Sequence, residues 1–182
     1  MAIHQIQVRY DPTADRLLLQ LRTTDAEVYA VWLTRRMVQR LYPPFRQAVA
    51  QASVARTAPQ ALPVPEARQM LEQAALQRTL EGADFAQPFA SADVSHPLGP
   101  EPLLPDAADL RPGADGQLTL AVREPRGRRI EIALNAELAT ALLRLLDSAL
   151  GAAEWGLPAT PAPGATAAET SPEPLPPRRL VS

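Results

Sequence analysis

The chain has 182 residues, of which 46% are hydrophobic, so it can build one ordinary domain or two small halves that share a core. Its 20 prolines and its aromatic content of 4% indicate that much of the chain lies outside that core. The formal charge of −2 argues against a protein that coats nucleic acid through net charge alone, and the absence of cysteine excludes structural disulfides and thiolate metal sites.

The first 33 residues predict three strands. Residues 2–10 and 16–23 alternate between apolar and polar side chains, as half-buried strands do. Residues 11–15 predict the turn between them, because Pro12 presets φ and the flanking aspartates can bond their own backbone. Residues 27–33 predict a third strand. The outer face of this sheet carries three apolar side chains, Leu18, Val28 and Trp32.

A helix is expected to begin at Arg35, with the Thr34 hydroxyl accepting a hydrogen bond from a backbone N–H of the first turn. Apolar side chains follow at helical spacing, at Met37, Leu41, Phe45 and Val49. Pro43 and Pro44 lie inside this pattern, and a proline removes a backbone donor and restricts the residue before it. The sequence therefore predicts a kink or two short helices.

The middle of the chain is expected to be a connector. Pro65 suits the first turn of a further helix, and Gly82 suits its end. Residues 61–110 hold two arginines against eight acidic residues, so the connector is acidic. Residues 83–112 show no periodicity and contain six prolines, which predicts a segment that wraps the surface or is partly disordered.

The last third predicts strand, turn, strand and helix. Residues 117–123 and 128–134 alternate like the first strands, and Asn135 is placed to cap a helix that reaches about Trp155. Beyond that helix, proline, alanine and threonine dominate and leave too little apolar surface to offset the entropy of ordering. We therefore expect residues 158–182 to be a disordered tail.

Residues 17–46 and 118–147 carry the same apolar pattern at a constant offset of 101 positions. Five of the thirty aligned pairs are identical, and Arg22 falling on Arg123 is one of them. A repeated unit usually means that neither copy buries its apolar face alone. The match fits an internal duplication, and it also fits two unrelated ββα units, because alternation followed by a helical period is common.

These elements predict an α+β fold in which two tandem ββα-type units share one antiparallel-sheet-and-helix core. We expect residues 1–56 to form the first unit, with an extra N-terminal strand. Residues 57–112 would then be the helical and proline-rich acidic connector, and residues 113–157 the second unit. Residues 158–182 would be the tail, which is rich in proline and alanine.

Candidate catalytic residues are few. The only histidines are His4, on the first expected strand, and His96, in the connector. Ser91, Asp93 and His96 are close in sequence, but a triad needs a base held within hydrogen-bond reach on a rigid frame, which a loop does not supply. Neither metal-ligand spacing nor a phosphate-binding glycine loop is visible. We expect no enzyme activity, no cofactor, no metal and no small-molecule substrate.

All 18 basic residues are arginines. Arg35 and Arg36 fall in the first turn of an expected helix, where the helix dipole disfavours positive charge by about 0.3–1 kcal/mol. One compensation is an external anion such as phosphate, which a helix N-terminus favours. The internal alternatives are an ion pair with Asp11, Asp15 or Asp25 in the neighbouring turns, or packing of the arginine stems over Trp32.

A wider arginine surface gives an alternative function. Its members are Arg16, Arg22, Arg35, Arg36, Arg40, Arg126, Arg128 and Arg129. With Trp32 beside them, they form the combination that holds single-stranded nucleic acid, in which charges follow the phosphates and rings stack on bases. Tandem sheet-and-helix units resemble the architecture of Whirly-type single-strand binders, although no motif is shared and fold does not determine function.

The outer-face residues Leu18, Val28 and Trp32 favour a different function. Apolar side chains gathered on one sheet face indicate a surface that another protein, or a second copy of the chain in a homodimer, covers. We therefore expect a small non-catalytic binding or assembly protein that acts through these three residues. Single-stranded nucleic-acid binding is the alternative.

No signal peptide and no run of about 18 apolar residues is visible, so we expect a cytoplasmic protein without membrane contact.

The expected tail contains one short motif. Residues 174–179, Pro-Leu-Pro-Pro-Arg-Arg, match the polyproline pattern read by SH3-like grooves. Proline-rich tails also produce this pattern by chance.

Overall fold

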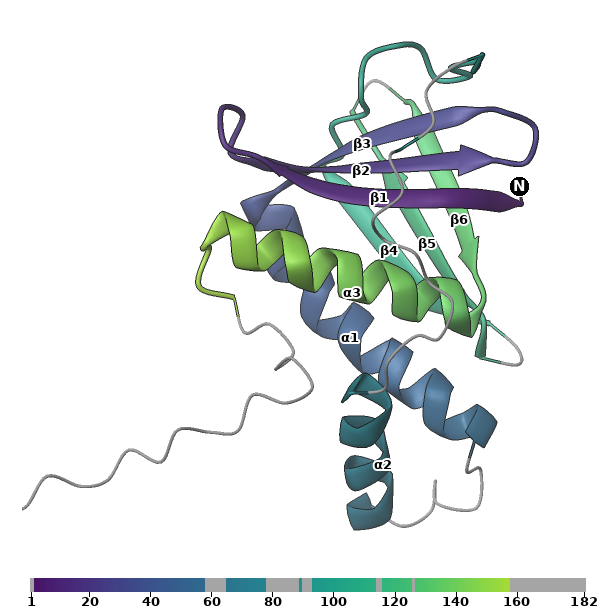
Figure 1. Ribbon diagram of the computed structural model, residues 1–182, viewed down its shortest axis with the longest axis vertical. Helices are drawn as coiled ribbons and strands as arrows, with labels where there is room; N and C mark the ends of the chain where they lie inside the picture. Colours follow the sequence, from purple (N-terminus) through teal and green to yellow (C-terminus); the bar gives the residue numbers. More distant parts are fainter. Residues whose placement is uncertain are drawn as a thin grey trace, which may run out of the picture.

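The computed structural model describes residues 2–57, 65–77, 89, 93–113, 116–125 and 127–157. Their fold is α+β, as the sequence predicted, and it contains helices and two three-stranded antiparallel sheets where ββα-type units were expected. In chain order the elements are β1 (Ile3–Asp11), β2 (Arg16–Thr23), β3 (Val28–Thr34), α1 (Arg35–Thr57), α2 (Pro65–Gln77), β4 (Ala107–Pro112), β5 (Leu118–Arg123), β6 (Arg129–Leu134) and α3 (Ala136–Ala153) (Figure 1). The expected tail, 158–182, lies outside the described residues.

The first sheet has the strand order β1-β2-β3. Its first turn forms because Asp11 Oδ1 accepts hydrogen bonds from the backbone N–H groups of Thr13 and Ala14, both at 2.9 Å. Asp15 completes the turn in the left-handed region, with φ of 47°, which aspartate tolerates better than most side chains. The predicted turn is therefore confirmed, and it places Arg16 opposite Thr34 at the end of β3.

The second sheet has the order β4-β5-β6, and β4 corrects the sequence-based expectation. Residues 107–112 were expected to lie in a connector without periodicity, but they pair antiparallel with β5. The strand is short and lies at the sheet edge, where its last residue, Pro112, pairs opposite Leu118. A proline is tolerated on an edge strand because no neighbour needs its missing donor.

Helix α1 also corrects an expectation, since it runs through Pro43 and Pro44 as one helix of 23 residues. Both prolines are exposed, as are Gln39 and Arg40, whose carbonyls lose their helical donors. Water can bind carbonyls on an exposed face, so two separate helices do not form. Both expected caps are confirmed: Thr34 Oγ1 accepts from Met37 N–H at 3.2 Å, and Asn135 Oδ1 accepts from Leu138 N–H at 2.8 Å.

The chain before β4 joins the two sheets at a corner. The N–H of Trp32 donates to the carbonyl of Leu103, and the N–H of Leu103 donates to the carbonyl of Ala30, both at 2.8 Å. Three residues later, the N–H of Asp106 donates to the carbonyl of Arg123 in β5 at 3.1 Å. The same strand-like segment thus leaves the edge of β3 and enters the second sheet, as corner strands do in packed sheets.

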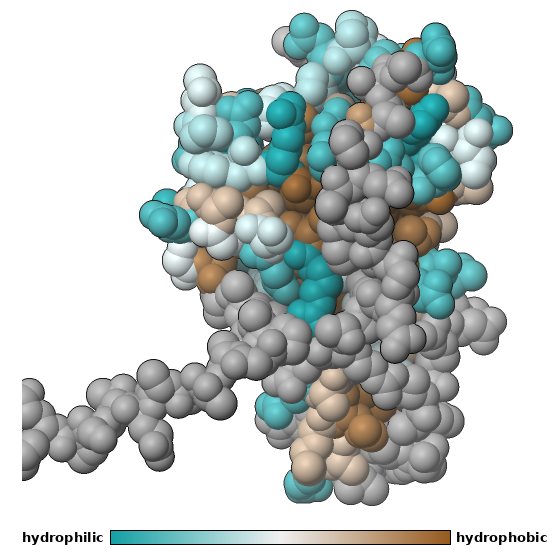
Figure 2. All heavy atoms as spheres, in the orientation of Figure 1, coloured by the Kyte–Doolittle hydropathy of each residue, from teal (hydrophilic) through white to brown (hydrophobic). Residues whose placement is uncertain are grey.

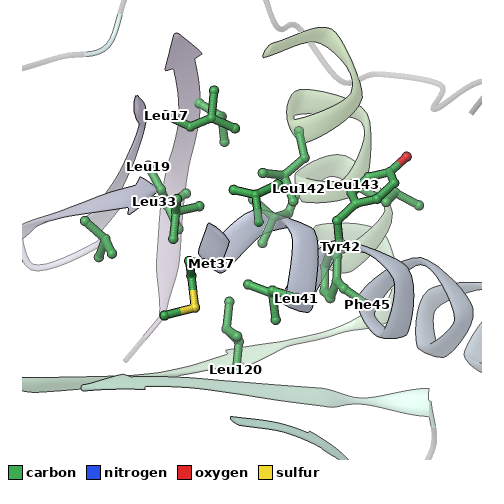
Figure 3. Packing of buried hydrophobic residues seen from close by; sticks show 14 of the residues in the cluster. Leu17, Leu19, Leu33, Met37, Leu41, Tyr42, Phe45, Leu120, Leu142 and Leu143 are labelled. Atoms are coloured by element: carbon green, nitrogen blue, oxygen red, sulfur yellow. The ribbon is translucent and has the colours of Figure 1, made fainter. Parts of the chain in front are cut away.

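Both halves contribute to one hydrophobic core. Side chains of the first sheet, including Leu17 and Leu19, face Leu142 and Leu143 of α3 (Figure 3). The helices are exchanged between the sheets, because α3 contacts β1 more extensively than β6, and α1 contacts β4 more extensively than β3. Figure 1 shows α3 running alongside β1. Each sheet therefore packs against the helix of the other half as well as against the helix that follows it in the chain.

The two halves correspond in register at the offset of 101. Leu17 pairs with Leu33 in the first sheet, and Leu118 pairs with Leu134 in the second. The helices begin at Arg35 and at 136, which are also 101 positions apart. Residues 17–33 and 118–134 therefore match in strand pairing as well as in apolar pattern.

Surface hydrophobicity is unevenly distributed. Figure 2 shows apolar side chains on α2 in the lower part of the view and polar side chains over the sheets at the top. Among the large apolar side chains that the structure describes, Met70 on α2 is 71% exposed and Leu104 at the sheet corner is 40% exposed. Within the same residues, no helix combines the length and the apolar character that crossing a membrane requires.

Candidate interaction groove

A groove of about 800 Å³ opens at the sheet corner. It lies between the start of β2, the end of β3 and the turn between β5 and β6. The segment that joins the two sheets, residues 95–106, forms its remaining side, and we call it the corner segment. Its lining consists of Arg16, Trp32, Thr34, Arg36, Glu101, Pro102, Leu104, Pro105, Asp106, Glu124, Pro125 and Arg128. Four residues singled out from the sequence meet here, namely Arg16, Trp32, Arg36 and Arg128. We call this feature the Trp32 groove.

Trp32 is the apolar centre of the groove. Its backbone is fixed on both sides, by Leu18 opposite it in β2 and by Leu103 along the edge of β3. The side chain is half-buried, so one part of the indole stays available to a ligand. Leu104 follows Leu103 and adds a second partly exposed apolar side chain.

The predicted three-residue contact face needs correction, because Leu18 and Val28 are each only 4% exposed. Leu18 is the cross-strand neighbour of Trp32, and such neighbours share one face at close distance. Val28 lies beside the corner segment, since its N–H donates to the carbonyl of Ser95 at 2.8 Å. Of the three residues, Trp32 alone offers substantial surface.

Arg128 builds one wall of the groove. It forms two hydrogen bonds with the carboxylate of Glu124, and one of them, from Nη2 to Oε2, measures 3.0 Å. Its Nη1 donates to the carbonyls of Leu98 and Glu101, each at 3.0 Å. The hydrogen bond to Glu124 raises the pKa of Arg128. This arginine therefore has internal partners and fastens the corner segment to the second sheet.

Among the residues that the structure describes, Glu124 is the one charged residue that is buried, at 7% exposed. Besides Arg128, its Oε2 accepts from the backbone N–H of Leu104 at 3.4 Å. Leu104 lies where the chain leaves one sheet for the other, so its N–H has no strand partner in a regular ladder. A buried donor without a partner costs free energy, and the Glu124 carboxylate removes that cost.

Arg35 also has an internal partner. Its Nη2 donates to the carbonyl of Trp155 at 3.1 Å, and its charge helps to lower the pKa of Asp15. This partner is a backbone carbonyl and not one of the three aspartates that the sequence suggested for an ion pair. Arg35 fixes the end of α3 against the start of α1.

The Asp15 carboxylate joins this cluster at the same end of the molecule. Its Oδ1 accepts from Trp155 Nε1 at 2.8 Å and from the Tyr10 hydroxyl at 2.9 Å. The hydrogen bond from Trp155 contributes most to lowering the pKa of Asp15, and the hydrogen bond to Asp15 raises the pKa of Tyr10. The rings of Tyr10 and Trp155 meet edge to face with centroids 5.9 Å apart. Sequence reasoning missed this cluster, because its members are 140 residues apart.

Three other arginines remain available to a ligand. The side chains of Arg16, Arg36 and Arg40 form neither a hydrogen bond nor an ion pair within the part of the chain that the structure describes. A second groove of about 430 Å³ adjoins the Trp32 groove and is lined by Arg40. Both grooves share Thr34, Arg36, Pro105 and Asp106, so Arg36 stands where they meet.

The remaining predicted arginines lie apart from both grooves. Arg22 pairs opposite Val28 at the other end of β3, and its Nε is buried without a hydrogen-bond partner. Arg129 is exposed at the start of β6, opposite Arg123. Arg126 lies outside the described residues. The structure therefore brings together only part of the expected basic surface.

Acidic residues that the sequence did not single out line the same grooves. Glu101 and Asp106 are exposed and form no side-chain hydrogen bond or ion pair with the other described residues. The floor of the groove also contains prolines, among them Pro102 and Pro105. These residues lie in the segment without periodicity, so no local pattern marks them as neighbours of Trp32. The Trp32 groove thus combines an apolar floor with charges of both signs.

No hydrogen bond joins the candidate catalytic residues that the structure describes, His4, Asp93 and His96. His4 on β1 and His96 in the corner segment are both exposed, and Ser91 lies outside the described residues. Within the described ranges, no group of three or more His, Cys, Asp or Glu side chains is placed to hold a metal ion. In comparisons with protein-family models, curated proteins and solved structures, this chain matches none.

Proposed function

We propose that this chain is a non-catalytic binding or assembly protein that holds a protein partner in the Trp32 groove. The observation that carries the proposal is the presence of two partly exposed apolar side chains, Trp32 and Leu104, in one groove with charged residues around them. Protein interfaces have this composition, with an aromatic anchor at the centre and polar groups at the rim.

Charges of both signs favour a protein partner over nucleic acid. Arg16 and Arg36 would attract a phosphate backbone, but Glu101 and Asp106 in the same groove would repel it. A protein surface can place opposite charges against each of these groups, which gives specificity and orientation.

Single-stranded nucleic acid is the second candidate. Arg16, Arg36 and Arg40 lack internal partners among the described residues and line two adjoining grooves beside Trp32. A strand that follows both grooves would place phosphates on the arginines and one base on the indole.

We also propose that the two halves descend from one duplicated unit with a third strand, βββα rather than ββα. The equal register of β2–β3 and β5–β6 at the offset of 101 supports this origin. The exchange of helices between the sheets supports it further, because exchanged packing explains why neither copy buries its apolar face alone. On this proposal the second copy is mainly scaffold, and the groove draws Trp32 and Arg36 from the first.

Co-purification of the full chain with matched variants tests the proposed function. Trp32→Ala removes the aromatic centre, and Met70→Ala removes an equally prominent apolar side chain on α2. We expect a bound protein, or a second copy of the chain, to be lost with Trp32→Ala and retained with Met70→Ala. Equal retention by both folded variants would refute a partner site at Trp32.

A further inference from the structure

We propose that the occupant of the Trp32 groove is a proline-rich segment of this chain, residues 174–179, Pro-Leu-Pro-Pro-Arg-Arg. This inference rests on the proposed function, because it names the kind of segment that the groove recognises. A partner protein with a similar segment would then compete with residues 174–179 for the same site.

The apolar floor of the groove suits a proline-rich segment. Polyproline II segments dock against exposed aromatic rings, and they lose little entropy because their conformation is already restricted. Trp32 offers a half-buried indole, and Leu104 offers a second apolar contact beside it. Together they form a floor that prolines and Leu175 can cover.

Charge complements the apolar contact. Glu101 and Asp106 are exposed acceptors without a side-chain partner among the described residues, and the segment ends in Arg178 and Arg179. An arginine guanidinium pairs with a carboxylate through two parallel hydrogen bonds, so two arginines can use both acids. On the other side of the prolines, Glu173 suits the unpaired arginines of the groove.

Chain connectivity makes the contact feasible within one molecule. The carbonyl of Trp155 accepts from Arg35, and Arg35 lies between two residues that line the groove, Thr34 and Arg36. The last described residues therefore lie next to the start of α1, and the same helix start contributes Arg36 to the groove. Pro174 is 17 positions after Leu157, and 17 residue steps span up to about 50 Å in polyproline II geometry and about 20–25 Å on average as a flexible chain.

Cysteine cross-linking in the full chain tests this contact, because the natural sequence contains no cysteine. Leu104→Cys is combined with Leu180→Cys, which leaves residues 174–179 intact. The control combines Leu180→Cys with Met70→Cys on α2, whose side chain is more exposed. We expect an internal disulfide between positions 104 and 180 to form at least about tenfold faster than in the control, because docking raises the effective concentration.

Three results would overturn the proposal. Equal rates for the two pairs would show that the segment does not dock at Leu104. A disulfide between two molecules, seen as a dimer without reductant, would show that the segment of a second copy is the occupant. An unchanged rate after Arg178→Glu with Arg179→Glu would refute the pairing with Glu101 and Asp106.

The two proposals fail separately. If the cross-link is slow but Trp32→Ala still releases a bound protein, the groove binds a partner and residues 174–179 are not its occupant. If the cross-link is fast but Trp32→Ala releases no protein, the groove serves the chain itself and the proposed partner function fails.

Discussion

Trp155 Nε1 donates a hydrogen bond of 2.8 Å to Asp15 Oδ1, and this bond joins the end of α3 to the first turn of the chain. Trp155 is 5% exposed, so its indole N–H depends on this acceptor. The bond lies next to Arg35 and thus beside the helix start that forms one side of the Trp32 groove. The cluster of Asp15, Arg35 and Trp155 therefore holds the end of α3 near the helix start that contributes to the groove.

Asp15→Asn should destabilise the protein at neutral pH and have less effect in acid. The folded-state pKa of Asp15 lies below its ordinary value of 3.8, mainly because Trp155 donates to the carboxylate. The resulting stability is present above the unfolded-state pKa and is lost as pH falls through the folded-state pKa. Urea unfolding of both proteins at about pH 7 and about pH 3 measures this difference. A gap that is equally large at both pH values would contradict the charged role of Asp15.

Arg128→Ala should destabilise the sheet corner by about 3 kcal/mol, because it removes the guanidinium that bonds both oxygens of the buried Glu124 carboxylate. Glu124→Gln in the same chain should restore part of that loss, since a neutral amide is cheaper to bury than a carboxylate that has lost this cation. Chemical denaturation of the two single variants and the double variant gives the coupling energy. Additive losses would show that the two residues do not act as a pair.

Leu142→Ala should cost about 2–5 kcal/mol and should weaken both halves together. Leu142 is 1% exposed and faces side chains of the first sheet, although it belongs to the second half (Figure 3). For each protein, we expect circular dichroism and tryptophan fluorescence to report the same unfolding midpoint, and we expect that midpoint to be lower in the variant. Two separate transitions would contradict a shared core.

Salt dependence distinguishes the nucleic-acid alternative from the protein-binding proposal. Contacts from Arg16, Arg36 and Arg40 to phosphates would give a log–log salt slope of about −2 for a single strand. Arg36→Ala with Arg40→Ala would then reduce the size of that slope by about 1.4. We expect instead no salt-sensitive binding of an oligonucleotide at low salt. A slope that responds to the double variant would establish the alternative.

The elements with clear periodicity could be predicted, and those held by distant partners could not. Alternation predicted β2 and β5, and a continuous apolar stripe predicted α3, because these patterns are local. β4 escaped prediction because its six residues lack alternation and owe their strand conformation to pairing with β5. The continuity of α1 depends on exposure around Pro43, which no local rule contains.

The same distinction holds for the candidate site. Trp32 and Arg36 were found because the alternation of the strand put an aromatic residue on its outer face, and because an arginine at a helix start opposes the helix dipole. The burial of Leu18 and Val28 was missed, since it depends on how the corner segment runs along β3. Glu101 became a groove residue only through that segment's position. The groove is therefore formed by strand residues, which the sequence pattern identified, together with residues of the segment without periodicity, which it did not.

Photo-cross-linking at position 104 of the full chain tests whether the Trp32 groove binds a protein. A photoreactive residue replaces the 40%-exposed Leu104, and the control carries it at Ser148, an exposed position on α3. We predict covalent protein adducts at position 104 that are absent at position 148 and are lost when Trp32→Ala is added. Adducts of nucleic acid alone, or the same protein adducts at both positions, would contradict a protein-binding groove at Trp32.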